Sequence, residues 1–133
     1  MKVHKIVNLI AFENTYLLEN DRHVIVVDPG SDWQKIQRKL EEIAKPITAI
    51  FLTHTHYDHI MSLDKVRDNF ANPPVYVAES EASWLYTPTD NLSGLDRHAD
   101  LEDIILRPAE HFFTYHHDYQ LDDFSIIDRK SVV

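Results

Sequence analysis

Short apolar segments separated by polar turns open the chain and predict strands. Residues 5–10 and 15–18 flank Asn14 and favour an opening hairpin. Residues 23–27 contain the run Val24-Ile25-Val26-Val27, which is typical of a strand buried on both faces. This third strand ends at the turn residues Asp28-Pro29-Gly30.

A helical repeat follows this turn. Ser31 lies three residues before Gln34, which is the spacing of a capping box, and Pro46 marks the end of the segment. The periodicity predicts an amphipathic helix of about fourteen residues. Its apolar positions are Trp33, Ile36, Leu40 and Ile43.

A second apolar strand, residues 49–52, leads directly into a cluster of histidines at 54–59, and a second helical pattern begins at Ile60. Strand, helix and strand in this order predict a βαβ unit, whose ligand sites gather at the carboxyl ends of its strands. Asp28 and His54 both follow such an end.

The later elements are less regular. Residues 75–78 predict a short strand, residues 79–86 a helical turn, and residues 87–100 a polar loop. Residues 111–116 and 124–127 have the pattern of two arms of a hairpin. No repeat or linker divides the chain, so we expect residues 1–133 to form a single domain.

Composition and charge narrow the classes of partner. The chain is 44% hydrophobic and 26% charged, as in an ordinary globular protein, and its formal net charge is −9. That charge argues against a nucleic-acid or anionic-membrane partner and favours a small-molecule substrate. Without a long apolar run or a secretion signal, the expected location is the cytoplasm. The absence of cysteine leaves only imidazole and carboxylate groups as strong metal ligands.

The segment His54-Thr55-His56-Tyr57-Asp58-His59 carries the candidate chemistry. His54 and His56 are two residues apart in an extended loop, so their rings project to one side and can share a metal ion. Asp58 and His59 follow where a helix begins and offer a carboxylate and an imidazole to a neighbouring metal position. The alternative reading makes Asp58 a helix N-cap and the histidines ordinary polar loop residues.

This His-x-His-x-Asp-His segment after a buried strand resembles the second signature motif of the metallo-β-lactamase superfamily, and Val27-Asp28-Pro29-Gly30 resembles its first. Together, the short opening hairpin and the segment Thr53-His54-Thr55-His56-Tyr57-Asp58-His59 are most similar to small glyoxalase-II-like bacterial hydrolases. The resemblance implies an α/β (α+β) fold, the N-terminal half of a four-layered αββα sandwich, with a mixed sheet and helices on one face.

The resemblance also implies a site and an activity. His54 and His56 would bind one metal ion, usually zinc, with manganese or iron as other candidates, and Asp58 and His59 a second. Asp28 would support the site by hydrogen bonds, although an aspartate before Pro-Gly also commonly caps its own turn. A hydroxide between the metals would attack an ester or thioester in a small acyl substrate, as in hydroxyacylglutathione hydrolases. Asp58, as the catalytic residue, and the three histidines would all be indispensable.

The family has three further metal ligands, two histidines and a bridging aspartate. This sequence shows none of them in the turns where the family carries them. His116 or His117 could replace one of them, but they lie in a strand-like segment and not in the turn that the family uses. The alternatives are therefore an inactive, truncated remnant that binds metal weakly or not at all, and a half-domain completed by another chain. Exposed apolar sheet surface would favour self-association.

Overall fold

The fold is built on one mixed sheet, and the computed structural model describes residues 1–94 and 102–114. The strands lie in sequence order, with β1 and β3 antiparallel to β2 and with β3, β4, β5 and β6 parallel to one another. The elements are β1 (Lys2–Val7), η1 (Ile10–Phe12), β2 (Asn14–Glu19), β3 (Val24–Val27), α1 (Trp33–Ile43), β4 (Ile47–Phe51), η2 (Tyr57–His59), α2 (Leu63–Asn69), β5 (Val75–Ala78), η3 (Glu79–Tyr86), α3 (Pro88–Asn91) and β6 (His111–Phe113).

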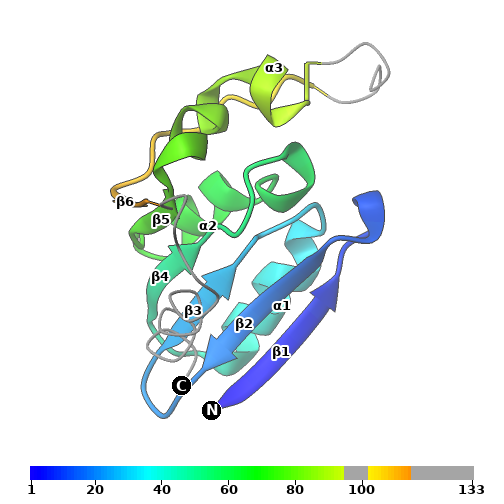
Figure 1. Cartoon of the computed structure of the whole chain (residues 1–133). Coiled ribbons are helices and arrows are strands. Elements are labelled where there is room, and N and C mark those ends of the chain that lie inside the picture. The colour runs from blue at the N-terminus through cyan, green and yellow to red at the C-terminus, as the bar shows by residue number, and fades with distance from the viewer. Residues whose placement is uncertain (95–101, 115–133) are drawn as a thin grey trace, which may run out of the picture.

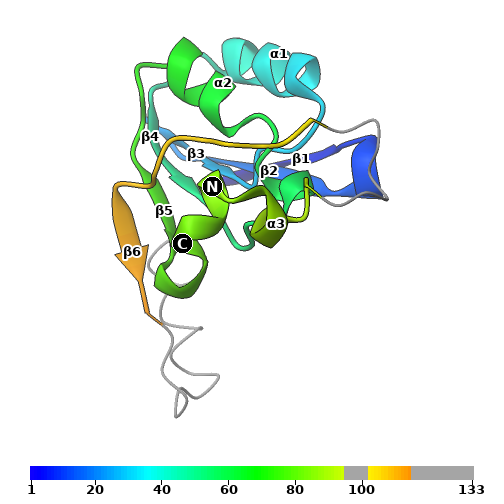
Figure 2. The same ribbon diagram turned by 90° about the horizontal axis from the view of Figure 1, so that it is seen from above.

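Two helices cover one face of this sheet. Figure 2 shows α1 and α2 side by side on the same face, as the family resemblance implies. Ile36 and Leu40 of α1 are buried against Val24 and Val26 of β3, and Val66 of α2 joins the same core. Alternate residues of each strand point into this core, because successive side chains on a strand face opposite sides.

The βαβ unit predicted from the sequence is present as β3, α1 and β4. The two strands are parallel, with Val27 paired to Phe51 at their carboxyl ends. Figure 1 shows η3 and α3 beyond these ends, on the side where the histidine segment emerges. Among the described residues, no helix combines the length and apolar character needed to cross a membrane.

Several details of the sequence prediction are wrong. Ser31 forms no capping box, because its hydroxyl accepts the backbone N–H of Ile10. The opening turn is not at Asn14, since residues 8–13 form it and include η1. Part of the predicted polar loop forms the helix α3, because Pro88 suits the first turn of a helix.

Two further expectations concern strands. Ile25 and Val27 are only half-buried, so β3 is not buried on both faces within the described part of the chain. Residues 111–113 form a strand as expected, but β6 pairs in parallel with β5. The rest of the predicted hairpin, including His116 and His117, lies outside the described residues.

Candidate metal centre

The carboxyl ends of β3 and β4 bring the two sequence motifs together. Asp28 follows β3, and its backbone N–H donates to the carbonyl of Phe51 at 3.0 Å, extending the pairing of the two strands. Leu52 is buried directly after β4 and anchors the start of the histidine segment. The site thus lies where ligands commonly bind in α/β units.

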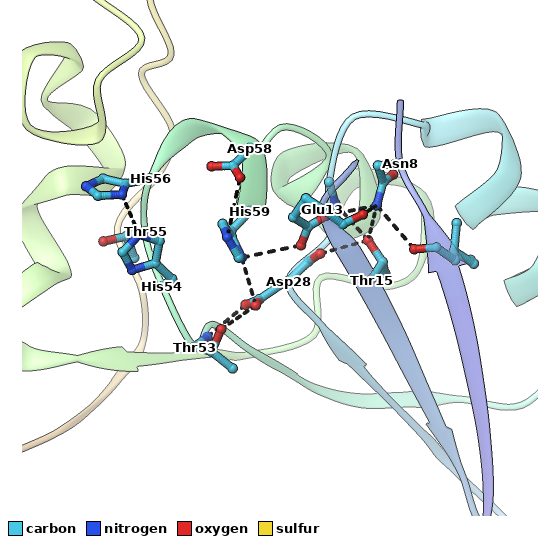
Figure 3. Close-up of polar contacts among 12 residues, drawn as sticks. Asn8, Glu13, Thr15, Asp28, Thr53, His54, Thr55, His56, Asp58 and His59 are labelled. Atoms are coloured by element: carbon cyan, nitrogen blue, oxygen red, sulfur yellow. Dashed lines mark hydrogen bonds and ion pairs between the residues drawn. The ribbon is translucent and has the colours of Figure 1, made fainter. Parts of the chain in front are cut away.

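His54 and His56 converge as their two-residue spacing predicts. The Nε2 atom of His54 contacts the Nδ1 atom of His56, and the ring centroids are 4.0 Å apart (Figure 3). Thr55 points the other way and is fully buried. Two imidazole nitrogens therefore face a common point at the edge of the loop.

Asp58 and His59 lie beside this pair in η2. The Oδ2 atom of Asp58 is 3.5 Å from Nε2 of His59, and the ring of His59 is 5.0 Å from that of His54. Neither η2 nor α2 has a side-chain N-cap hydrogen bond, so Asp58 caps neither of these helices. The alternative interpretation of Asp58 as an N-cap is wrong.

Asp28 braces His59 and Thr53 at once. One oxygen, Oδ1, accepts the backbone N–H of Thr53 at 2.7 Å. The other, Oδ2, accepts the hydroxyl of Thr53 and lies 2.9 Å from Nδ1 of His59 (Figure 3). The carboxylate serves the histidine segment and is not turned back on its own Pro-Gly turn. Because the carboxylate of Asp28 occupies Nδ1 of His59, the other ring nitrogen, Nε2, is left to face Asp58.

A buried polar network behind Asp28 was missed by the sequence analysis. Glu13 is 5% exposed, and Oε1 of its side chain accepts the amide N–H of Asn8 at 2.8 Å. Thr15 accepts a second Asn8 N–H and the backbone N–H of Gly30, and donates to the carbonyl of Asp28. No spacing motif links these residues to Asp28, because a strand turn and a distant loop meet only in three dimensions.

Gly30 is required by this network. A Cβ atom there would lie 2.7 Å from the amide nitrogen of Asn8 and closer still to the carboxylate of Glu13. Any larger residue would push the Asn8–Glu13 network away from the Asp28 turn.

The ionisable groups of the site differ in their pKa values. Burial, with help from the nearby His54, lowers the pKa of His56. Burial also lowers the pKa of His59, but the hydrogen bond to Asp28 and the charges of Asp28, Asp58 and Glu13 outweigh it, so that its pKa is raised overall. Burial raises the pKa of Glu13 to about 8.

The donor set fits a divalent metal. Three imidazoles and one carboxylate are ligands that zinc, manganese and iron accept. Nε2 of His54 and Nδ1 of His56 face each other, while Nδ1 of His59 is already the partner of Asp28. A further group of donor atoms, from Glu13, Asp28 and His59, lies within 4.8 Å. In that group Nδ1 of His59 is the hydrogen-bond partner of Asp28, so a cation bound there would have to displace this hydrogen bond.

Comparison with known proteins identifies the family. The model of the metallo-beta-lactamase superfamily matches residues 11–128. A protein of Streptococcus pyogenes serotype M6 named "Probable metallo-hydrolase" is 59% identical over 124 residues, which are 93% of this chain and 53% of that protein. A hydroxyacylglutathione hydrolase of Photobacterium profundum is 36% identical over 74 residues, covering 53% of this chain and 29% of that protein.

Solved structures share the fold. The crystal structure of BLEG-1 B3 metallo-beta-lactamase superposes with a TM-score of 0.75 at 32% identity, covering 90% of this chain and 56% of that one. The structure of TTHA1623 in a di-iron-bound form gives a TM-score of 0.64 at 22% identity, with 89% and 56% covered. The chain spans about half the length of the streptococcal protein and of these two solved structures. It belongs to the metallo-beta-lactamase superfamily.

Proposed function

We propose that this chain contributes the histidine-rich part of a metal-dependent hydrolase that cleaves an ester or thioester bond in a small acyl substrate. One observation carries the proposal: Nε2 of His54 and Nδ1 of His56 converge beside the Asp58–His59 pair, and Asp28 holds the outer nitrogen of His59. The relative named as a hydroxyacylglutathione hydrolase supports the thioester class.

Each side chain has a separate task. His54 and His56 would hold one cation, for which zinc is the first candidate. Asp58 and His59 would hold a second cation. A cation held by these groups supplies Lewis acidity and lowers the pKa of bound water. Asp28 keeps the proton of His59 on Nδ1, so that the lone pair of Nε2 stays available. Asp58 adds the negative charge that two dications need nearby.

Metal content tests this proposal. The purified chain is loaded with Zn²⁺, dialysed and analysed for metal. The parent chain and a His23→Ala control, altered at an exposed histidine away from the cluster, should retain zinc. The double variant His54→Ala/His56→Ala should lose it. Equal zinc content in the double variant and the control would refute the assignment of the first metal position.

Hydrolysis is tested separately, with a hydroxyacyl thioester of glutathione as the probe and release of free thiol as the readout. We expect turnover that depends on added metal and is lost in Asp58→Asn. A chain that binds zinc but releases no thiol would contradict the thioester activity and leave the metal site standing.

A second candidate function is that of a half-domain completed by another polypeptide. It is favoured by the face of the sheet opposite α1 and α2, which is half-buried in the described part of the chain. In that case thiol release appears only when the complementary polypeptide is added. An inactive remnant releases no thiol with or without that polypeptide.

A further inference from the structure

The helical segment η3 supports the histidine pair from the side opposite Asp28. Thr55, between the two histidines, donates its backbone N–H to Oε1 of Glu81 at 3.0 Å and its hydroxyl to the same oxygen at 2.8 Å. This oxygen also lies 3.8 Å from Nδ1 of His54, and the Glu81 side chain is only 20% exposed. The carboxylate of Glu81 thus fixes the loop backbone at Thr55 and places a negative charge beside Nδ1 of His54.

Trp84, on the next turn of η3, contacts the other histidine. Its ring stacks on that of His56, with centroids 5.3 Å apart and planes inclined by 15°. The carbonyl of Trp84 accepts the side-chain N–H of Asn91 at 2.7 Å, and Asn91 is fully buried. Leu85 follows in the core. The stacking surface is therefore held in place from behind.

We propose that Glu81 and Trp84 are positioning residues for the first metal position: Glu81 selects the tautomer of His54, and Trp84 fixes the ring plane of His56. The metal part of this inference rests on the function proposed above. A neutral imidazole carries one proton, and only its unprotonated nitrogen can bind a cation. The charge of Glu81 beside Nδ1 favours the proton there, which frees Nε2 to face His56.

A purely structural role for Glu81 would act through Thr55 alone. Glu81→Gln separates the two roles, because the amide oxygen can still accept both Thr55 hydrogen bonds while the negative charge is gone. Glu79→Gln is the matched control, since Glu79 is exposed at the start of the same helix.

The tautomer is measured on the metal-free chain by long-range ¹H–¹⁵N correlation of the histidine rings. We expect His54 to carry its proton on Nδ1 in the parent and in Glu79→Gln, and to shift toward the Nε2–H form in Glu81→Gln. A parent His54 with its proton on Nε2, or an unchanged tautomer in Glu81→Gln, would overturn the role of Glu81.

Trp84 is tested in the same spectra with Trp84→Leu. Stacking on an indole shifts imidazole ring protons upfield, so the His56 signals should move downfield in this variant while the signals of residues in α1 stay in place. Unmoved His56 signals would overturn the stacking assignment.

Co²⁺ titration then connects both residues to metal binding. Glu81→Gln and Trp84→Leu should each weaken Co²⁺ binding about tenfold or more, as the loss of partners behind metal ligands commonly does. Parent-like affinity in both variants would overturn the positioning role. If the parent itself takes up no Co²⁺, the proposed function and the metal part of this inference fail together, and the ring spectra still decide the tautomer and the stacking.

Discussion

Oδ2 of Asp28 lies 2.9 Å from Nδ1 of His59, a contact that joins two residues 31 positions apart in the sequence. Asp28 reaches this position with a φ angle of 51°, in the left-handed region that costs most residues about 1–2 kcal/mol. Aspartate tolerates this region better than most residues. The backbone conformation turns the carboxylate away from its own turn and toward the histidine segment.

Asp28→Asn tests this contact with little change in shape. Asparagine also tolerates the left-handed region, but its amide lacks the charge that holds a proton on Nδ1 of His59. We expect metal affinity at the Asp58–His59 position to fall about 10- to 100-fold, measured by competition with a chromogenic chelator. Asp21→Asn, at an exposed turn, is the control and should bind as the parent does. Parent-like affinity in Asp28→Asn would contradict the bracing role.

The buried carboxyl of Glu13 predicts a pH dependence of stability in the metal-free chain. Its pKa is raised to about 8 in the folded chain from an ordinary 4.5. Between these values the unfolded chain releases a proton that the folded chain keeps. The contribution of this group to folding is therefore fully present below about pH 4.5 and is lost as the pH rises through 8.

Glu13→Gln removes this ionisation while keeping an oxygen for Asn8. The quantity to compare is the unfolding free energy of the variant minus that of the parent. This difference should be larger at pH 9 than at pH 5 by at least about 1 kcal/mol. Urea unfolding at both pH values measures the difference. Glu41→Gln, on the exposed face of α1, should show no such gain. A pH-independent difference between Glu13→Gln and the parent would show that Glu13 ionises normally.

The sequence is informative where a local repeat determines the structure. The hydrophobic period of residues 33–43 predicts α1, and the spacing of His54 and His56 predicts that their rings converge. Both follow from chain geometry alone. Metal ligation by these residues stays a prediction, because converging nitrogens show a fitting donor set and not a bound ion.

The parts that could not be predicted depend on contacts between distant segments. Glu13 and Glu81 look like ordinary surface residues in the sequence, yet one is buried behind Asp28 and the other holds Thr55. Ser31 has the spacing of a capping residue, but a backbone N–H from the opening turn reaches its hydroxyl instead. Tertiary partners decide such cases, and no short pattern encodes them.

Gly30→Ala should destabilise the chain. The φ angle of Gly30 is not in the left-handed region, so the effect comes from space alone: the added methyl group would overlap the side chains of Asn8 and Glu13. Overpacking of this kind typically costs about 1–3 kcal/mol. Adding Glu13→Ala to Gly30→Ala should recover part of the loss, because one of the overlapping groups is removed. Strictly additive losses in thermal or urea unfolding would contradict the steric explanation.

The face of the sheet opposite α1 and α2, half-buried among the described residues, predicts self-association. Paired positions form a row across the strands on this face: Tyr16 opposite Val27, Val27 opposite Phe51, and Phe51 opposite Tyr76. The rings of Phe51 and Tyr76 are 4.9 Å apart, and all four side chains are only half-buried in the described part of the chain. Contiguous apolar surface of this kind promotes association, at roughly 25 cal/mol for each Å² removed from water.

We expect sedimentation to give a mass above that of one chain, and Phe51→Lys to lower it. Gln34→Lys adds the same charge on the exposed face of α1 and should leave the mass unchanged. A parent chain that sediments as a monomer at every concentration would contradict the expected self-association.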